Sequence, residues 1–415
     1  MYDGWVEAAE RGELTGVCML DMSAAFDVVN HELLLKKLRL YGFNQTSLTW
    51  MTSYLSSRKQ SVCIDGTLSS PLEISAGVPQ GSILGPLFYI IFTNDLPESI
   101  LTCQKHSGPA DDNSLFSTHC QECGSVCCFA DDSTLSLSDK DPDKLTEKLT
   151  EKYALLSDYL NSNKLKLNND KTHLILMTTA ENRRLKNYPS IRIDTDTESI
   201  ETTESEKLLG GIIHQNLKWG EHIADNESSL LKSLSTRLNA LKKICCHSDL
   251  KTRLMIANGL FMSKLIYLLP VWGGAGTGLM RMLQVVQNTA ARYVTRSSWY
   301  TPSTDLMKSC NWMSMKQLSA YHSLVITHKT LLSKEPQYLY DKFNNTQYPC
   351  NTRLSANNSI RIDGSFNADL SLTLSSFRWR SSGLYNTLPV GLRAQTRVSG
   401  FKSDLKGWVK QNIDT

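Results

Sequence analysis

The alternation of apolar and polar positions predicts strands and helices in turn along the first half of the chain. After a short polar stretch, residues 1–13, the apolar run Leu14–Leu20 is typical of a buried strand. Further on, the runs 126–130 and 133–138 flank the acidic pair Asp131-Asp132, as the two strands of a hairpin would. The pattern therefore predicts a hairpin with two carboxylates at or beside its turn.

Apolar residues three or four positions apart predict helices between these strands. Asn30 is a suitable N-cap for a helix that runs to Leu40, with Gly42 where a C-terminal cap would lie. One apolar stripe predicts an amphipathic helix over 143–160. Shorter signals predict a helix from about Thr46, a hairpin around Asp65-Gly66, a helix over 82–94 and a strand over 173–178. This succession predicts an α+β fold, in which a sheet carries helices on one face.

From Ser229 onward the pattern becomes helical. Apolar residues recur at spacings of three and four over 230–241 and again over 279–293, with a break at Pro270-Val271-Trp272-Gly273-Gly274. Residues 301–415 show less pattern. We therefore predict a second, mainly α-helical region after the sheet.

Two other stretches of the sequence indicate that the acidic pair belongs to a functional site. Alone, an Asp pair in a turn is explained by the bonds that Asp makes to its own backbone. However, the first strand also runs out into an Asp, Asp21, and residues 76–87 form a turn-rich segment that leads into an apolar helix. Carboxylates from two different strands are what a two-metal phosphoryl-transfer site needs. Their hard oxygen atoms suit Mg²⁺.

Five motifs in order resemble the reverse transcriptase of non-LTR retrotransposons, in the jockey-like or RTE-like group. The stretch LDMSAAFDVVNH looks like palm motif A, GVPQGSILGPLFYIIFTNDLP like motif B and FADDS like motif C. Residues 163–172 look like motif D, and residues 208–219 are similar to motif E, the primer grip. The resemblance covers roughly residues 14–300, and it implies a ferredoxin-like polymerase palm followed by a helical thumb.

The resemblance also implies how the chain is divided. We expect a reverse transcriptase palm with partial fingers over residues 1–225, including an insertion at about 98–125. A helical thumb is expected over residues 226–300. A C-terminal extension without an assigned role is expected over residues 301–415.

The matching positions carry the expected catalytic roles. By resemblance, Asp21, the Met22 carbonyl and Asp131 hold two Mg²⁺ ions, and Asp132 is a nearby or second-metal carboxylate. Lys171 is a candidate to protonate the pyrophosphate leaving group or to hold its charge. An exposed lysine without a role is the alternative for Lys171.

Other matching positions carry the expected contacts to the nucleotide. Phe26 corresponds to the aromatic residue that excludes a ribose 2′-hydroxyl and so selects dNTPs, whereas without the family it is explained as a core aromatic. Gln80 corresponds to the motif B glutamine along the incoming nucleotide, presented by a turn that Pro79 and Gly81 fix. The implied partners are an RNA template, a DNA primer and dNTPs.

The insertion contains a pattern that could bind zinc. Cys103-x2-His106 is followed after thirteen residues by Cys120-x2-Cys123, and two paired ligand sets of this kind fit tetrahedral Zn²⁺. The alternative is a loop with incidental cysteines.

Composition narrows the class of protein. With 415 residues, 41% of them hydrophobic and 20% charged, the chain is globular, and its net charge of +3 is only mildly basic. Between Ser228 and Tyr300, ten Lys or Arg residues accompany one acid, Asp249, which suits a phosphate backbone or a solvated helical face. No membrane span and no secretory signal are visible, and eleven cysteines suit a reduced compartment. We therefore expect an intracellular protein of the nucleus or cytoplasm, with no membrane partner.

The chain departs from the family at its start. Only twenty residues precede Asp21, whereas the family's basic fingers lie upstream, so we expect an N-terminally truncated form. Two hypotheses follow. The first is an RNA-directed DNA polymerase that adds dNTPs to a primer 3′ end. The alternative is a catalytically inactive nucleic-acid-binding remnant that lacks the fingers.

Overall fold

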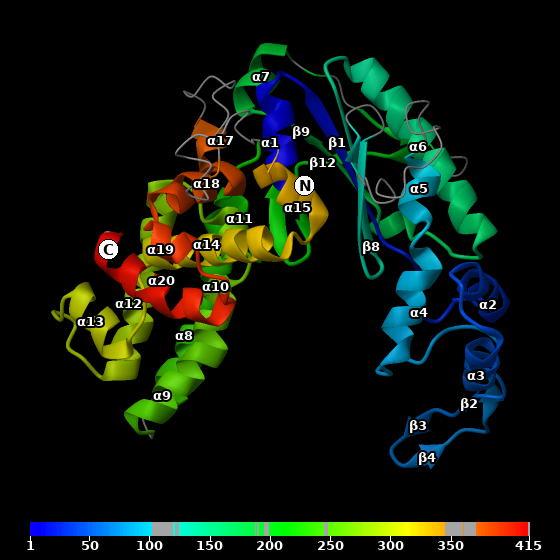
Figure 1. Cartoon of the computed structure of the whole chain (residues 1–415), viewed down its shortest axis with the longest axis horizontal. Helices are drawn as coiled ribbons and strands as arrows, with labels where there is room; N and C mark the ends of the chain where they lie inside the picture. Colours follow the sequence, from blue (N-terminus) through cyan, green and yellow to red (C-terminus); the bar gives the residue numbers. More distant parts are fainter. Residues whose placement is uncertain are drawn as a thin grey trace. The chain divides into compact units, whose positions relative to one another are not determined.

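The structure is a computed structural model, which describes residues 1–101, 119–120, 124–186, 188, 191–194, 199–244, 248–344, 360 and 371–413. The chain forms two compact units (Figure 1). The sheet unit comprises residues 12–177 and 181–204, and the helical unit comprises residues 1–11, 178–180 and 205–415. The division into palm, thumb and C-terminal extension stays a prediction, because it assigns functional roles to residues 1–225, 226–300 and 301–415.

A six-stranded sheet in the order β12-β9-β1-β8-β7-β6 forms the base of the sheet unit. All its neighbouring strands are antiparallel except β12 and β9. The bounds are β1 (Leu14–Leu20), β6 (His119–Cys120), β7 (Gly124–Phe129), β8 (Asp132–Asp139), β9 (His173–Met177) and β12 (Thr202–Thr203). The predicted first strand, the predicted hairpin and the strand predicted from His173 are therefore confirmed.

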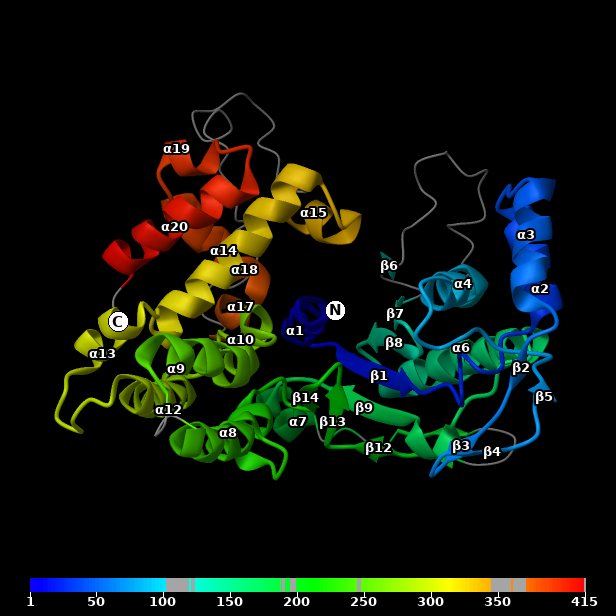
Figure 2. The ribbon, with the colours of Figure 1, turned by 90° about the horizontal axis from the view of Figure 1, so that it is seen from below.

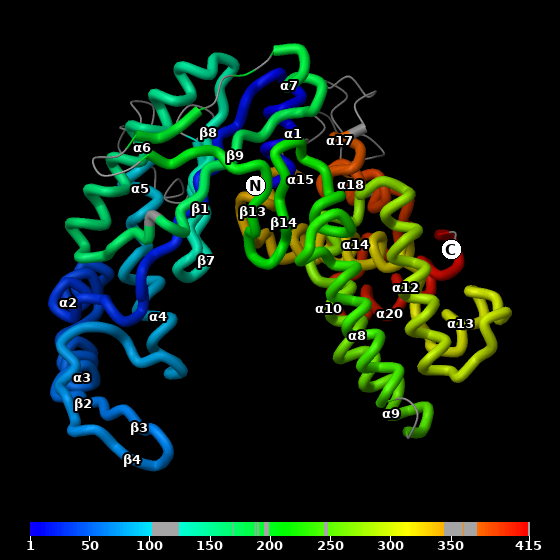
Figure 3. Tube along the Cα trace, turned by 180° about the vertical axis from the view of Figure 1, so that it is seen from behind, coloured from blue at the N-terminus to red at the C-terminus, as the bar shows by residue number. Residues whose placement is uncertain are grey.

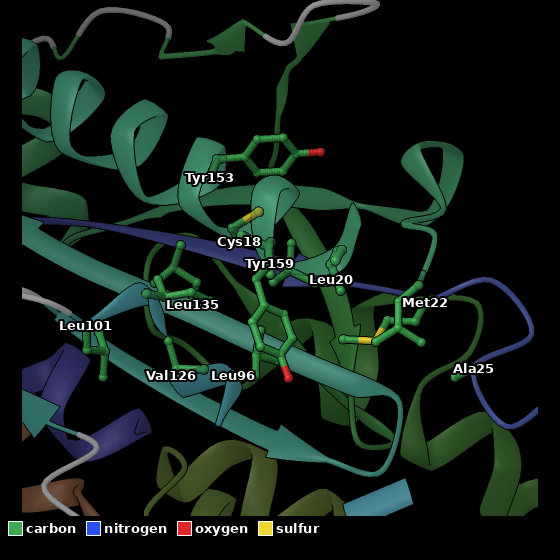
Figure 4. Packing of buried hydrophobic residues seen from close by; sticks show 14 of the residues in the cluster. Cys18, Leu20, Met22, Ala25, Leu96, Leu101, Val126, Leu135, Tyr153 and Tyr159 are labelled. Carbon is green, nitrogen blue, oxygen red and sulfur yellow. The ribbon is translucent and has the colours of Figure 1, made fainter. Parts of the chain in front are cut away.

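Five helices pack with this sheet in one apolar core. They are α2 (His31–Leu40), α3 (Gln45–Leu55), α4 (Leu84–Thr93), α5 (Leu96–Ile100) and α6 (Pro142–Ser162). Their buried side chains form one cluster with Leu14, Cys18 and Leu20, which share a face of β1. Figure 4 labels Cys18 and Leu20 among the residues of this cluster. Gly16 lies on this face too, where an added Cβ would meet Leu149 of α6 at 2.5 Å. The α+β fold with helices on one face of a sheet is confirmed.

The predicted helix signals correspond to observed contacts. The Asn30 side chain accepts a hydrogen bond from Leu33 N, as an N-cap should, and Gly42 has a φ of +85°. The other elements of this unit are short: β2 (Lys59–Gln60), β3 (Cys63–Ile64), β4 (Thr67–Leu68), β5 (Leu72–Glu73), η2 (Asn169–Lys171), α7 (Ala180–Lys186, of which Ala180 groups with the helical unit), β10 (Ile193–Asp194) and β11 (Ser199–Ile200). The predicted Asp65-Gly66 hairpin is present as β3 and β4.

A charged network fastens three of these helices together. Lys37 Nζ of α2 donates to Asp95 Oδ1 at 2.8 Å, to Phe92 O at 2.6 Å and to Tyr159 OH of α6 at 3.2 Å. Tyr159 OH in turn donates to Asp95 Oδ1 at 2.6 Å. The Lys37 side chain is only 14% exposed. Hydrogen bonds that involve a charged group and are shielded from water are the stronger ones.

Lys37→Met is therefore expected to lower the free energy of unfolding by about 2 kcal/mol, because Asp95 and Tyr159 lose a charged donor at a shielded position. Urea unfolding followed by circular dichroism would measure it. The matched control is Lys36→Met in the same helix, since Lys36 pairs with exposed Glu32 and its replacement should leave the midpoint unchanged. Equal midpoints for the two variants would contradict the role of the network.

The helical unit begins with an element that the polar N-terminal stretch did not indicate, α1 (Tyr2–Glu10). A hairpin, β13 (Ser205–Leu208) and β14 (Gly211–His214), precedes the helices and is visible in Figure 3. The remaining elements are η3 (Glu221–Asp225), α8 (Leu230–Ile244), α9 (Leu250–Ala257), η5 (Asn258–Met262), α10 (Ser263–Ile266), α11 (Leu269–Trp272), α12 (Thr277–Thr295), α13 (Ser303–Cys310), α14 (Met315–Ser333), α15 (Gln337–Asn344), α17 (Ser371–Ser375), α18 (Phe377–Thr387), α19 (Val390–Arg393) and α20 (Val398–Asn412). The long helix α14 packs against α11, α12, α18 and α20 (Figure 2).

Acidic residues of α1 bind the start of a helix far along the chain. Asp3 accepts hydrogen bonds from the backbone N–H groups of Phe377 and Arg378, at 3.0 and 2.8 Å. Glu7 pairs with the Arg378 guanidinium at 3.3 Å. Since the first N–H groups of a helix lack partners within it, Asp3 caps α18 from a distance of more than 370 residues in sequence.

A buried histidine gives the helical unit a dependence on pH. His222 in η3 is 4% exposed, and its Nδ1 accepts a hydrogen bond from Ile212 N at 3.2 Å. Its ring lies near Trp219 and Trp272. Burial, and after it the charge of Lys264, lowers the pKa of His222 to about 4. The neutral imidazole is therefore the form that the fold contains.

We expect the stability of this unit to fall as pH drops from about 6.5 to about 4, because the unfolded chain then binds a proton that folded His222 does not. The slope from this one group is about 1.4 kcal/mol per pH unit. Burial also lowers the pKa of His322 and His328, which add to it. In urea unfolding at a series of pH values, His222→Gln should make the dependence shallower. An unchanged slope would refute the assignment.

No helix of the described residues is both long and apolar enough to cross a membrane.

Candidate functional site

Strand register brings the predicted carboxylates to one end of the sheet. Leu20, the last residue of β1, pairs with Ser133 of β8, so Asp21 follows directly beside the β7–β8 turn. Phe129 pairs with Asp132, which leaves Ala130 and Asp131 as a two-residue turn. Two-residue hairpin turns need a positive φ, and Ala130 supplies it with a φ of +53° although it is not glycine. The register of the hairpin therefore places Asp131 at the tip of the turn.

A second segment holds the backbone around Asp21 from its other side. The Asp21 carbonyl accepts a hydrogen bond from Asn168 N at 2.9 Å, and Ser23 N donates to Lys166 O at 2.9 Å. Met22 and Leu167 form an isolated antiparallel bridge between these bonds. The predicted motif D stretch thus continues the sheet past the end of β1, and it carries Lys171 to the same place.

One open pocket of about 350 Å³ lies at this end of the sheet. Its walls combine residues from four separated stretches: Asp21, Met22, Ser23, Ala24, Ala25, Phe26, Gln80, Asp131, Asn168 and Lys171. Six predicted site residues, Asp21, Met22, Phe26, Gln80, Asp131 and Lys171, are therefore brought together. Asp132 and Gly81 do not line it.

The charges around this pocket influence one another. Lys171 Nζ lies 3.5 Å from Asp21 Oδ2, with the lysine side chain 66% exposed and the aspartate 27%. Burial, and then the charges of Asp131 and Asp21, raise the pKa of Asp132. The three carboxylates are thus close enough to repel one another, and a bound cation would relieve that repulsion.

An aromatic floor supports the motif A loop. The ring of Phe26 packs on that of Tyr89, a buried residue of α4, with centroids 4.6 Å apart. Tyr89 OH donates to Met22 Sδ at 3.2 Å. Burial, followed by the charge of Asp131, raises the pKa of the Tyr89 hydroxyl, which therefore remains protonated. Phe26 is packed against the core and also lines the pocket, so both of its predicted roles are compatible with its position.

The turn before α4 is tied to the motif A loop by backbone contacts. Gly77 N donates to Val29 O and Val78 N to Phe26 O, both at 2.8 Å. Gly77 has a φ of +91°, and an added Cβ would lie 2.6 Å from the Asp27 carbonyl oxygen, so only glycine fits. Gln80 is exposed, and its Nε2 donates to Asp27 Oδ1 at 3.0 Å. This bond holds the glutamine amide beside the pocket.

The turn itself has the predicted form. Ser82 N donates to Pro79 O at 3.3 Å, and Gly81, the third residue of this turn, has a φ of +81°. The Ser82 hydroxyl donates to Pro79 O at 2.7 Å and accepts from Gly85 N at 2.9 Å, which ties the turn to the first turn of α4. The predicted helix begins at Leu84, two residues later than expected.

The predicted metal ligands fall in two places: the pocket for Mg²⁺, and the insertion at about 98–125 for Zn²⁺. Among residues that the structure describes, no three or more His, Cys, Asp or Glu side chains gather closely enough to hold a metal. Mg²⁺ is commonly bound by one or two carboxylates with waters and substrate phosphates, so Asp21 and Asp131 on one pocket fit it. Of the predicted zinc ligands, Cys103, His106 and Cys123 lie outside the described residues, as does the side chain of Cys120.

Two neighbours of the site were not singled out from sequence. Asn168 lies within the predicted motif D stretch, and this position could have indicated that it lines the pocket. Tyr89 had no such signal beyond its position in an apolar helix, since only packing brings its hydroxyl to Met22.

Comparisons with known proteins agree with the motifs. The family described as "Reverse transcriptase (RNA-dependent DNA polymerase)" matches residues 5–213. The chain is 28% identical over 305 residues to the RNA-directed DNA polymerase from the mobile element jockey of Drosophila funebris, which covers 72% of this chain and 30% of the relative. The jockey polymerase of Drosophila melanogaster is 25% identical over 301 residues, with the same two coverages. The chain thus spans about a third of the length of these relatives.

Among solved structures, the chain is similar to telomerase from Candida albicans, determined in complex with a fragment of telomeric RNA. The identity is 12% and the TM-score 0.37, with 87% of this chain and 55% of that chain covered. Telomerase from Candida tropicalis gives an identity of 12% and a TM-score of 0.36, covering 82% of this chain and 55% of that one.

Proposed function

The chain belongs to the reverse transcriptase (RNA-dependent DNA polymerase) family, and from that premise we propose that it adds dNTPs to a primer 3′ end on an RNA template. The proposal extends to the jockey-like character of the element, since the similar polymerases come from jockey. The observation that carries it is the pocket in which Asp21 and Asp131 meet Phe26 and Gln80.

The carboxylates are proposed to form the cation-binding part of the site. Asp21, the Met22 carbonyl and Asp131 would hold Mg²⁺, with Asp132 as a nearby carboxylate. When bound, Mg²⁺ supplies activation of the primer hydroxyl and neutralisation of the triphosphate charge. The role of the sheet is to hold Asp21 and Asp131 in place, since neighbouring strands and a hairpin turn position them before any ligand arrives.

The remaining lining residues are proposed to bind the nucleotide. Phe26 would stand against C2′ of the sugar, with Tyr89 keeping its ring in place. Gln80, oriented by Asp27, would lie along the base pair that forms. Lys171 would hold the charge of the departing pyrophosphate, since it lines the pocket and lies 3.5 Å from Asp21.

The test is RNA-templated primer extension by the purified chain. A labelled DNA primer annealed to an RNA template is incubated with dNTPs and either Mg²⁺ or EDTA. We expect dNTP addition that requires Mg²⁺, follows the template sequence and disappears when the template is removed by ribonuclease before annealing. A folded chain that binds the primer–template without extending it would overturn the proposal.

A further inference from the structure

The loop between α12 and α13 presents two large aromatic side chains to solvent. Trp299 is 67% exposed and Tyr300 is 94% exposed. The two residues are the central pair of a turn, because Thr301 N donates to Ser298 O at 3.1 Å. Tips of turns usually carry Gly, Pro, Asn, Asp or Ser, so two adjacent aromatic rings at such a position call for an explanation.

Contacts with α12 and hydrogen bonds within the loop hold the loop that carries the two rings. The Arg292 guanidinium of α12 lies 4.7 Å from the centre of the Trp299 ring, and it donates to Thr301 O at 3.4 Å. Ser297 Oγ donates to Thr295 Oγ1 at 2.8 Å, and Tyr300 N donates to Ser298 Oγ at 3.3 Å. One face of Trp299 is therefore backed by a cation while most of the ring remains accessible.

The stretch of sequence that contains these rings has more cations than acids. Between positions 249 and 310 there are seven Lys or Arg residues and two Asp residues. This stretch contains α9, α12 and α13, and α12 packs against both of the others (Figure 2). Arg296 is exposed at the start of the loop. Arg253 of α9 is buried, 7% exposed, and donates to Val294 O at the end of α12, so it joins the two helices. The two acids are Asp249, the N-cap of α9, and Asp305 in the first turn of α13.

We infer that this loop is a stacking platform for unpaired bases of single-stranded RNA, outside the pocket that contains the carboxylates. Aromatic rings that stack on bases, set among cations that neutralise phosphates, are the chemistry by which proteins bind single strands without sequence preference. RNA is the strand we assign because the inference rests on the proposed function, which uses an RNA template. The surface would engage unpaired RNA separately from catalysis.

The test measures binding of fluorescein-labelled U20 RNA to the full chain by anisotropy, without primer or dNTPs. The double variant Trp299→Ala/Tyr300→Ala is expected to bind about tenfold more weakly or worse. Trp299→Phe/Tyr300→Phe, which keeps both rings, should bind as the unaltered chain does. The matched control is Trp50→Ala, because Trp50 is another exposed tryptophan, 57% exposed on α3 of the sheet unit, and should change binding less than twofold.

Salt dependence and a second probe separate the possible outcomes. Arg296→Gln should reduce the slope of log affinity against log salt by about 0.7, the value for one phosphate contact to a single strand. The inference is overturned if the unaltered chain does not bind U20, if the double alanine variant binds it equally well, or if dT20 is the preferred strand. It is also overturned if the variant changes only self-association, because the rings would then contact a second copy.

The same variants allow the RNA-binding platform and the proposed polymerase function to be tested separately. Primer extension on a short template without a long unpaired overhang should be unchanged in the double alanine variant, since the loop is not part of the pocket lining. Loss of U20 binding with intact extension supports the platform. A chain that binds U20 through the platform yet extends no primer refutes the polymerase proposal alone.

Discussion

Asp131→Asn is expected to reduce RNA-templated primer extension by about 10³-fold or more. An uncharged amide at the tip of the β7–β8 turn keeps the shape of the side chain but removes the charge that would hold a cation in the pocket. Metal ions at such sites contribute several kcal/mol of transition-state stabilisation, and each 1.4 kcal/mol is about tenfold in rate. Single-turnover extension with saturating primer–template would measure the loss.

The fold should survive this substitution. Asp131 carries one of the charges that raise the pKa of Asp132, so its neutralisation removes repulsion and adds no strain to the turn. The urea midpoint is therefore expected to be unchanged or slightly higher. Asp158→Asn on the exposed face of α6 makes the same chemical change in the same unit and should retain full extension. If the Asp131→Asn variant extends the primer as fast as the Asp158→Asn variant, Asp131 is not part of the catalytic site.

Local pattern was enough to predict the framework that carries these carboxylates. The strand before Asp21, the hairpin around Asp131 and the helix that covers the sheet each follow from a period of two or of 3.6 in the apolar positions. The meeting of Asp21 and Asp131 on one pocket was implied by the order of the motifs, and it depends on strand pairing that no local window contains. The roles of these residues remain predictions.

Contacts between distant segments could not be predicted from the sequence. Asp3 caps α18 across almost the whole chain, so a search for caps within a few residues of a helix start would not find it. Likewise, Lys37 of α2, Tyr159 of α6 and Asp95, the N-cap residue of α5, lie far apart in the sequence, and nothing in their own neighbourhoods marks them as partners. The polar first residues gave no sign of α1, because a helix of nine residues is too short to be stable alone and depends on packing within the helical unit.

Phe26→Ala is expected to increase use of rNTPs relative to dNTPs by about tenfold to two-hundredfold. If the ring stands against C2′, its removal opens room for the ribose hydroxyl, and discrimination by the fit of one small group is of this size. The measurement is the ratio of kcat/KM for a dNTP and the matching rNTP in single-nucleotide extension. Phe26→Tyr retains a ring of similar bulk and should keep the original preference.

A second variant separates sugar selection from a purely structural role. Phe26 packs on Tyr89 and against the core, so its loss also lowers the free energy of unfolding, by about 1–3 kcal/mol for a half-buried ring. Phe43→Ala removes another ring that packs against the same core but does not line the pocket. We expect similar destabilisation in both variants and altered sugar selection only in Phe26→Ala. If the two variants lose stability alike and both still reject rNTPs, Phe26 is a core residue, and the choice of sugar must depend on another part of the pocket wall.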